Sequence, residues 1–204
     1  MKSLILGVFA AAFAVLGAPS QAVTLDFEDL VLGTRYNVGD SFTTSGVTVT
    51  AGDFTFSNGV TTNTGFSDVE TGGALGNGSG NELEVNNILL DFAVGNVTSL
   101  GFAFGEFGGN LNLRVNGDFR NFENFAQLDG LNVGGALVSV LNGFGNDQGT
   151  VSLTGLISDF ALGGQEFYID DLRTSAAVPL PASVLLLGSG LLGLLGLRRR
   201  NRVS

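Results

Sequence analysis

The sequence contains no cysteine, no histidine and no tryptophan. Without cysteine there is no disulfide framework, so an exported fold must depend on packing and on any bound ion. Without histidine the chain cannot build a Ser-His-Asp or Cys-His arrangement or a histidine-ligated metal centre. The lack of tryptophan removes the largest aromatic surface for stacking on a ligand. Paired carboxylates are therefore the catalytic groups that remain to be considered.

Positive charge is scarce between the two ends of the chain. Residues 23–176 hold all 19 acidic residues and only four arginines, so 19 − 4 leaves this body with a net charge of −15. Such a body repels nucleic acids and anionic lipid surfaces, and we expect no nucleic-acid partner. The charge suits solubility, cation binding or neutral partners such as sugars.

Residues 1–22 have the features of a secretory signal peptide. Lys2 supplies a short positive start, residues 4–16 form an apolar run, and small residues precede a cleavage point after Ala22. The alternative is an N-terminal anchor that stays in the membrane, but the run is too short to span a bilayer comfortably. We expect a signal helix that engages the secretion machinery and is then removed.

The C-terminal end predicts a transmembrane helix. Residues 178–197 are uncharged and consist mainly of Leu, Gly, Ala and Ser, over the length of about 20 residues that a hydrocarbon core requires. Arg198, Arg199 and Arg200 follow at once, as a stop-transfer cluster that stays on the cytoplasmic side. A buried core helix is the alternative, but such a helix would rarely be apolar on all faces and end in three arginines.

The tail, residues 176–204, resembles the PEP-CTERM sorting tail in the order of its three parts. A Pro-x-Pro motif precedes the hydrophobic segment and the basic terminus; its residues are Val178, Pro179, Leu180, Pro181, Ala182 and Ser183. Leu180 stands where the motif that names the family has Glu. The resemblance implies a Gram-negative bacterium that makes extracellular polysaccharide. It also implies processing by an exosortase, a membrane-embedded protease, so that residues 178–197 anchor the chain only transiently before it reaches the cell surface or the exterior.

The body, residues 23–175, shows short alternations of apolar and polar residues separated by glycine- and asparagine-rich turns. Asn116-Gly117, between two such runs, predicts a hairpin turn. The expected strands are 23–29, 46–51, 54–56, 82–85, 88–93, 100–104, 111–115, 137–141, 151–153 and 167–172. This pattern predicts an all-β domain, either an antiparallel β-sandwich or a barrel.

The first and last expected strands resemble the ends of jelly-roll domains of the carbohydrate-binding-module type. The segments concerned are 25–28 and 167–172. The resemblance implies a structural calcium ion held by Glu28 and Asp171, with Asp26 or Asp170 as helpers. Calcium prefers several hard oxygen ligands, which agrees with such a set. Neighbouring residues in a strand point to opposite faces, so we expect only one of Asp170 and Asp171 to join the site. The alternative is that these are solvated acids at strand edges.

Three functions remain open. The first is a non-enzymatic surface or matrix protein associated with extracellular polysaccharide, and the second is a carbohydrate-binding module. The third is a glycoside hydrolase that uses Glu82 and Glu84, which share one face of an expected strand, although two such acids more often form a solvated face. The glycine-rich residues 76–80 lack a following helix, so they predict turns and not a phosphate-binding loop.

Overall fold

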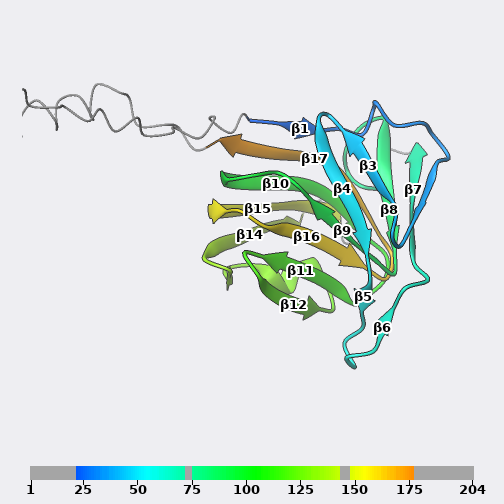
Figure 1. The fold of residues 1–204 in the computed structure, drawn as a ribbon. Helices are drawn as coiled ribbons and strands as arrows, with labels where there is room; N and C mark the ends of the chain where they lie inside the picture. Colours follow the sequence, from blue (N-terminus) through cyan, green and yellow to red (C-terminus); the bar gives the residue numbers. More distant parts are fainter. Residues whose placement is uncertain (1–21, 72–74, 143–147, 177–204) are drawn as a thin grey trace, which may run out of the picture. The chain divides into compact units, whose positions relative to one another are not determined.

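The computed structural model describes residues 22–71, 75–142 and 148–176. These residues form two antiparallel sheets and a short two-stranded ribbon, which confirms the predicted all-β, antiparallel architecture (Figure 1). The expected signal helix and the expected transmembrane helix, residues 178–197, lie outside the described residues. In the part of the chain that the structure describes, no helical segment has the length and hydropathy of a membrane span.

The larger sheet has nine strands, and its central strand is the last one in the described chain. In spatial order they are β13 (Asn132–Val133), β14 (Ala136–Asn142), β15 (Gln148–Ile157), β10 (Val97–Glu106), β17 (Phe167–Ala176), β8 (Asn81–Asn86), β7 (Phe66–Thr71) and β2 (Arg35–Asn37). The first strand, β1 (Thr24–Leu25), also pairs with β17, with Leu25 opposite Leu172. The two ends of the body are therefore joined in one sheet.

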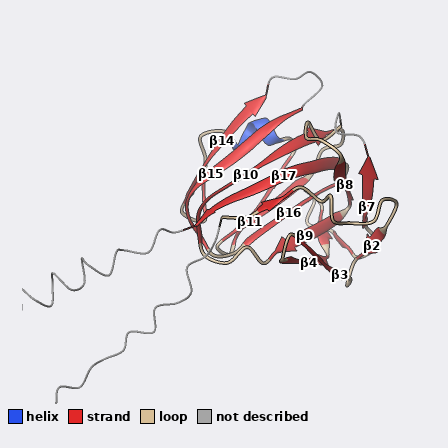
Figure 2. Ribbon diagram, turned by 90° about the horizontal axis from the view of Figure 1, so that it is seen from above, coloured by secondary structure: helices blue, strands red, loops and turns tan. Residues whose placement is uncertain are grey.

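The smaller sheet has six strands and forms the second layer of the sandwich (Figure 2). In spatial order they are β12 (Asp118–Phe122), β11 (Leu111–Val115), β16 (Phe160–Gly164), β9 (Ile88–Phe92), β4 (Val47–Gly52) and β3 (Ser41–Thr44). The ribbon consists of β5 (Phe54–Thr55) and β6 (Thr61–Thr62), and a single 3-10 turn, η1 (Phe125–Leu128), is found in the described part of the chain.

Phenylalanine builds much of the core between the sheets. Phe125 of η1 is fully buried, and its ring centroid lies 4.2 Å from that of Phe104, 5.6 Å from Phe167 and 5.8 Å from Phe102. Burying one such side chain contributes about 1.5–3 kcal/mol to folding. A core of this kind can stabilise the domain without the disulfides that the sequence cannot form.

The hairpin predicted at Asn116-Gly117 is confirmed. It joins β11 to β12, and both residues have positive φ, 50° and 80°, as a two-residue hairpin turn requires. The structure also contains strands that the sequence pattern did not predict: β2, β3, β6, β7, β12, β13 and β16. All five residues of β16 are buried, so this strand has no alternation to recognise.

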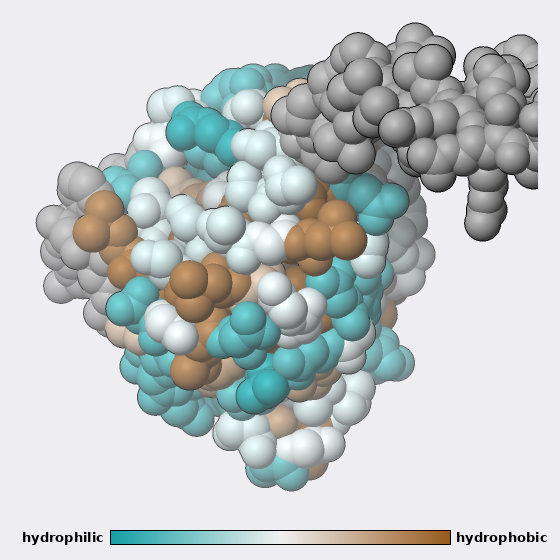
Figure 3. Space-filling view, turned by 90° about the vertical axis from the view of Figure 1, so that its left-hand side faces the viewer, coloured by the Kyte–Doolittle hydropathy of each residue, from teal (hydrophilic) through white to brown (hydrophobic). Residues whose placement is uncertain are grey.

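The surface of the domain is mixed in character. Figure 3 shows one side, on which hydrophobic patches are separated by hydrophilic ones. Several large apolar side chains are exposed in the described chain, among them Leu137, Leu141 and Leu156 on β14 and β15. Scattered apolar residues of this kind are normal on a monomeric surface.

Candidate functional site

Three carboxylates hold the glycine-rich segment 75–81 against the larger sheet. Glu82 Oε2 accepts a hydrogen bond from the backbone N–H of Gly76 at 2.6 Å, and Asp170 Oδ2 accepts one from Ser79 at 2.7 Å. Glu28 Oε1 accepts a third from the backbone N–H of Asn81 at 2.8 Å. Hydrogen bonds from backbone amides to ionised carboxylates are stronger than neutral ones, so this segment is held at three points.

The alternate glycines of this segment each lie against one of these carboxylates. A Cβ atom at Gly76 would lie 2.5 Å from Glu82 Oε2, and a Cβ atom at Gly78 would overlap the carboxylate of Asp170. A Cβ atom at Gly80 would overlap the carboxylate of Glu28, and Gly80 also has positive φ, 75°. The Gly-x-Gly-x-Gly pattern is therefore required by the close approach of backbone to carboxylate. Carboxylates surround residues 76–80, which agrees with the prediction that this segment is not a phosphate-binding loop.

The structure places two of the four predicted calcium residues against the same glycine-rich segment, although among the described residues the group of three acids whose oxygens lie within 4.8 Å of one another is a different one. Glu28 follows β1, which pairs with β17, and Glu28 and Asp170 therefore meet the same glycine-rich segment. Asp26 is exposed, and its Oδ1 accepts a 3.4 Å hydrogen bond from the backbone of Glu28. Asp171 instead pairs with Arg173 at 3.0 Å. The sequence did not indicate that Glu82 belongs to this group.

The expectation that Asp170 and Asp171 point to opposite faces is wrong. Ile169 and Leu172 both point into the core, with the two aspartates between them, and the pairing of β10 with β17 shifts at this point. Asp171 has a φ of 52°, in the left-handed region. This β-bulge turns both carboxylates to the outer side of the sheet, where Asp170 contacts Ser79 and Asp171 contacts Arg173.

Burial of the Asp170 and Glu82 carboxylates disfavours their charged forms. Asp170 is fully buried; burial raises its pKa to about 6, although hydrogen bonds from Ser79 and Asp171 oppose the rise. Burial also raises the pKa of Glu82, and the nearby charge of Glu70 adds to the effect. Among the described residues, Glu82 Oε1 has no hydrogen-bond partner although it is buried. Such a group carries a desolvation penalty that a bound proton or cation would relieve.

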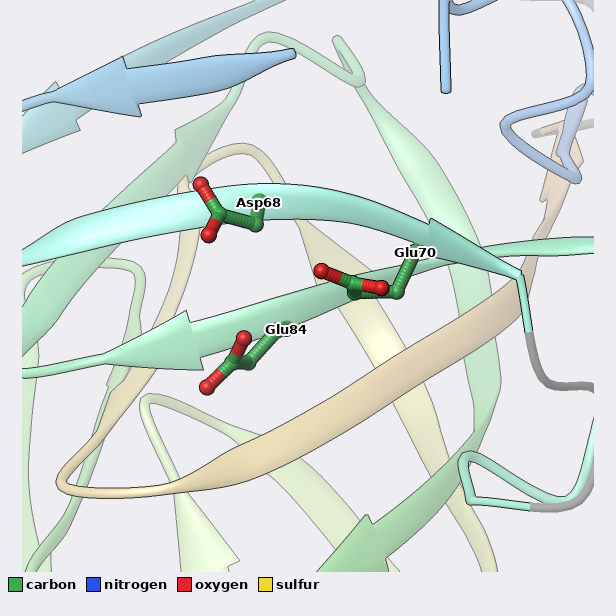
Figure 4. A group of neighbouring side chains, drawn as sticks. All are labelled: Asp68, Glu70 and Glu84. Atoms are coloured by element: carbon green, nitrogen blue, oxygen red, sulfur yellow. The ribbon is translucent and has the colours of Figure 1, made fainter. Parts of the chain in front are cut away.

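A second acidic group lies further out on β7 and β8. Oxygen atoms of Asp68, Glu70 and Glu84 lie within 4.8 Å of one another, and Figure 4 shows their side chains on two neighbouring strands. Arg35 forms a 2.5 Å ion pair with Asp68. Burial raises the pKa of Glu84, and the charges of Asp68 and Glu70 add to the rise. The sequence pattern missed this group because β7 was not predicted. Asp68 and Glu70 are two residues apart, as two acids on one face of a strand would be, and this spacing could have indicated the group.

The acids considered for hydrolysis have different environments. Glu82 is fully buried beneath the glycine-rich segment, so it is not part of a solvated face. Glu84 is partly buried and lies in the outer acidic group. The two side chains share one face of β8, as predicted, since Leu83 and Val85 point into the core between and beside them. Glu82 thus bonds the backbone of Gly76, whereas Glu84 lies beside two other acids.

Comparison with known proteins adds information about the tail. The PEP-CTERM protein-sorting motif matches residues 177–200, which include the predicted Pro-x-Pro motif, hydrophobic segment and Arg198–Arg200 cluster. A tail of this kind implies export, transient membrane anchoring and processing by an exosortase. Neither the curated proteins nor the solved structures gave a match. The chain therefore carries a PEP-CTERM sorting motif directly after the last strand of its β-sandwich.

Proposed function

We propose that this protein is a non-enzymatic component of the bacterial cell surface or extracellular matrix, exported, sorted through its tail and associated with extracellular polysaccharide. The sorting motif at residues 177–200 is the observation that carries the proposal. The strongly acidic body supports a role among neutral polymers, because it repels polyanions.

The contacts of the acidic side chains support a non-enzymatic role. A retaining or inverting glycosidase needs two carboxylates facing one accessible substrate bond. Glu82 instead accepts a backbone hydrogen bond beneath residues 75–81, and Glu84 lies with two further acids. A hydrolase remains the alternative that an activity assay on the polysaccharide of the producing cells would reveal.

Intact-mass analysis of protein recovered from the producing cells tests the sorting proposal. We expect a mass that corresponds to cleavage before Val23 and near Pro181. Replacing Arg198, Arg199 and Arg200 together with alanine should leave an unprocessed, longer form in the membrane fraction. A wild-type mature protein that still contains the arginine cluster would contradict processing. Failure of this protein to sediment with the extracellular polysaccharide would contradict the association.

A second proposal is that a structural calcium ion binds beside the glycine-rich segment, as in a carbohydrate-binding module. The buried and unpartnered Glu82 Oε1 favours it, because a cation would supply the missing partner. Glu28 and Asp170 contact the same segment as Glu82, and carboxylate oxygens are the hard ligands that calcium prefers. Asp171, which the resemblance makes a principal ligand, is next to Asp170 in the chain, and Asp26, a predicted helper, is two residues from Glu28.

Thermal melting tests this proposal. We expect a higher melting temperature in excess calcium than in chelator, and a smaller rise in magnesium. Glu28→Gln and Glu82→Gln should each reduce the calcium-dependent rise, whereas Glu123→Gln, a change at an exposed acid, should leave it intact. Equal melting temperatures in chelator and in calcium would exclude the site.

A further inference from the structure

An open groove of about 390 Å³ crosses the outer face of the larger sheet. It runs over three neighbouring strands, β15, β10 and β17. Its floor is Gly101 and Ala103 of β10, whose neighbours Leu100, Phe102 and Phe104 point into the core. Small side chains in the middle of a sheet leave a depression between the larger side chains on either side.

The cross-strand register places different chemistry on the two walls of this groove. Ser152 of β15 and Arg173 of β17 both pair with Gly101. Thr150 of β15 pairs with Ala103. One wall therefore offers two hydroxyl groups, and the other offers the ion pair of Asp171 with Arg173, whose atoms are 3.0 Å apart. Asn77, from the glycine-rich segment, adds an amide.

The neutral polar groups of the groove are available to a ligand. Within the described part of the chain, no hydrogen bond engages the side chains of Asn77, Thr150 or Ser152. Hydroxyl groups on the other sheet behave differently, since Ser41 donates to Thr50 at 3.2 Å. Donors and acceptors left free along one groove can be satisfied by the hydroxyl groups of a ligand.

The charge of the protein selects the class of ligand. The single cation of the groove is already paired with a carboxylate, and the body carries a net charge of −15 from 19 acids and four arginines. A polyanionic chain would be repelled. Phe102 lies in the core, only 3% exposed, so among the groove residues no aromatic ring is open for stacking. Recognition therefore depends on hydrogen bonds to hydroxyl groups.

We infer that this groove binds a segment of a neutral polysaccharide through the side chains of Asn77, Thr150, Ser152 and the Asp171–Arg173 pair. The inference deepens the proposed association with extracellular polysaccharide and rests on it. Each contact is weak by itself because it replaces a hydrogen bond to water. A polymer offers many equivalent segments, so weak binding to each one is enough to retain the protein in a matrix.

Affinity electrophoresis of the full-length chain tests the groove, with the polysaccharide of the producing cells separated into neutral and acidic fractions. We expect the neutral fraction to retard the protein and the acidic fraction to have no effect. Ala103→Leu should fill the floor and abolish the retardation. The double change Thr150→Ala and Ser152→Ala should weaken binding about tenfold, which corresponds to about 1.4 kcal/mol for the two hydrogen bonds together.

The matched control is the double change Thr43→Ala and Thr48→Ala, which removes two exposed hydroxyls from paired strands of the other sheet and should not affect retardation. Melting temperatures show whether each variant is folded. If Ala103→Leu does not fold, the double Thr150/Ser152 change still tests the groove. Retardation by the neutral fraction that survives both groove variants would overturn the inference but leave the association intact. Retardation by neither fraction would overturn both.

Discussion

The buried carboxylate of Asp170 predicts an unusual dependence of stability on pH. Its pKa is raised from 3.8 to about 6, chiefly by burial, so the folded state holds the proton more tightly than the unfolded state. The stabilisation is therefore complete below about pH 4 and is lost as the pH rises through 6. The shift corresponds to about 3 kcal/mol, because one pKa unit is worth 1.36 kcal/mol. Metal-free protein should thus become less stable between pH 4 and pH 6.5, where many proteins are most stable.

Other acids in the described chain do not cancel this effect in the same pH window. The pKa values of Glu82 and Glu84 are also raised by burial, so their contributions have the same sign. Hydrogen bonds from arginine lower the pKa values of Asp118 and Asp159, and one from Thr44 lowers the pKa of Asp29, so the contributions of these three acids have the opposite sign. The stabilisation that these acids provide is lost as the pH falls below their unfolded-state pKa of about 3.8, so it changes mainly at and below the lower edge of this window.

Thermal melting of the exported protein in chelator, followed by circular dichroism between pH 4 and pH 6.5, measures the effect. A change of about 3 kcal/mol corresponds to roughly 6–12 °C for a domain of this size. Asp170→Asn should remove most of the pH dependence, whereas Asp53→Asn, at an exposed site, should retain it. A melting temperature that is constant or that rises with pH in this window would refute the reasoning, as would an unchanged slope in Asp170→Asn.

Three further changes probe the packing on which the site depends, each measured by chemical denaturation. Gly78→Ala places a methyl group against the carboxylate of Asp170 and should cost about 1–3 kcal/mol, whereas Gly52→Ala, which meets only one backbone oxygen at 3.7 Å, should be nearly neutral. Phe125→Ala should cost about 3–5 kcal/mol, because its buried ring contacts three others; a loss below 1 kcal/mol would contradict its place in the core. Arg114→Ala should cost about 1–3 kcal/mol, since it leaves two partly buried carboxylates without their shared cation, and salt should reduce the loss.

The alternation of apolar and polar residues was enough to predict the class of the fold. It identified the strands whose outer face meets solvent, such as β4, in which Val47, Val49 and Ala51 are buried and the threonines between them are exposed. It failed for β16, which is buried along its whole length. It also failed for short strands such as β2, which form only by pairing with a neighbouring strand. Local pattern carries no information about burial on both faces or about pairing.

The candidate site was predictable only in part. Glu28, and Asp170 as a helper of Asp171, were implied by the resemblance of the two end segments to those of jelly-roll domains, and the pairing of β1 with β17 does bring those ends together. The role of Glu82 depends on the path of residues 75–81 across the sheet, which no local pattern encodes. The bulge at Asp171 arises from the way β10 and β17 pair, so strict alternation gave the wrong face for one of two neighbouring aspartates.

The position of β17 connects the fold to the sorting tail. This strand lies between β10 and β8 in the larger sheet, pairs with β1, and ends at Ala176, one residue before the sorting motif begins. The larger sheet therefore cannot close until nearly the whole body has emerged, because its central strand is made last. Cleavage near Pro181 leaves this strand whole, whereas cleavage before Arg173 would remove part of the centre of the sheet and of the groove.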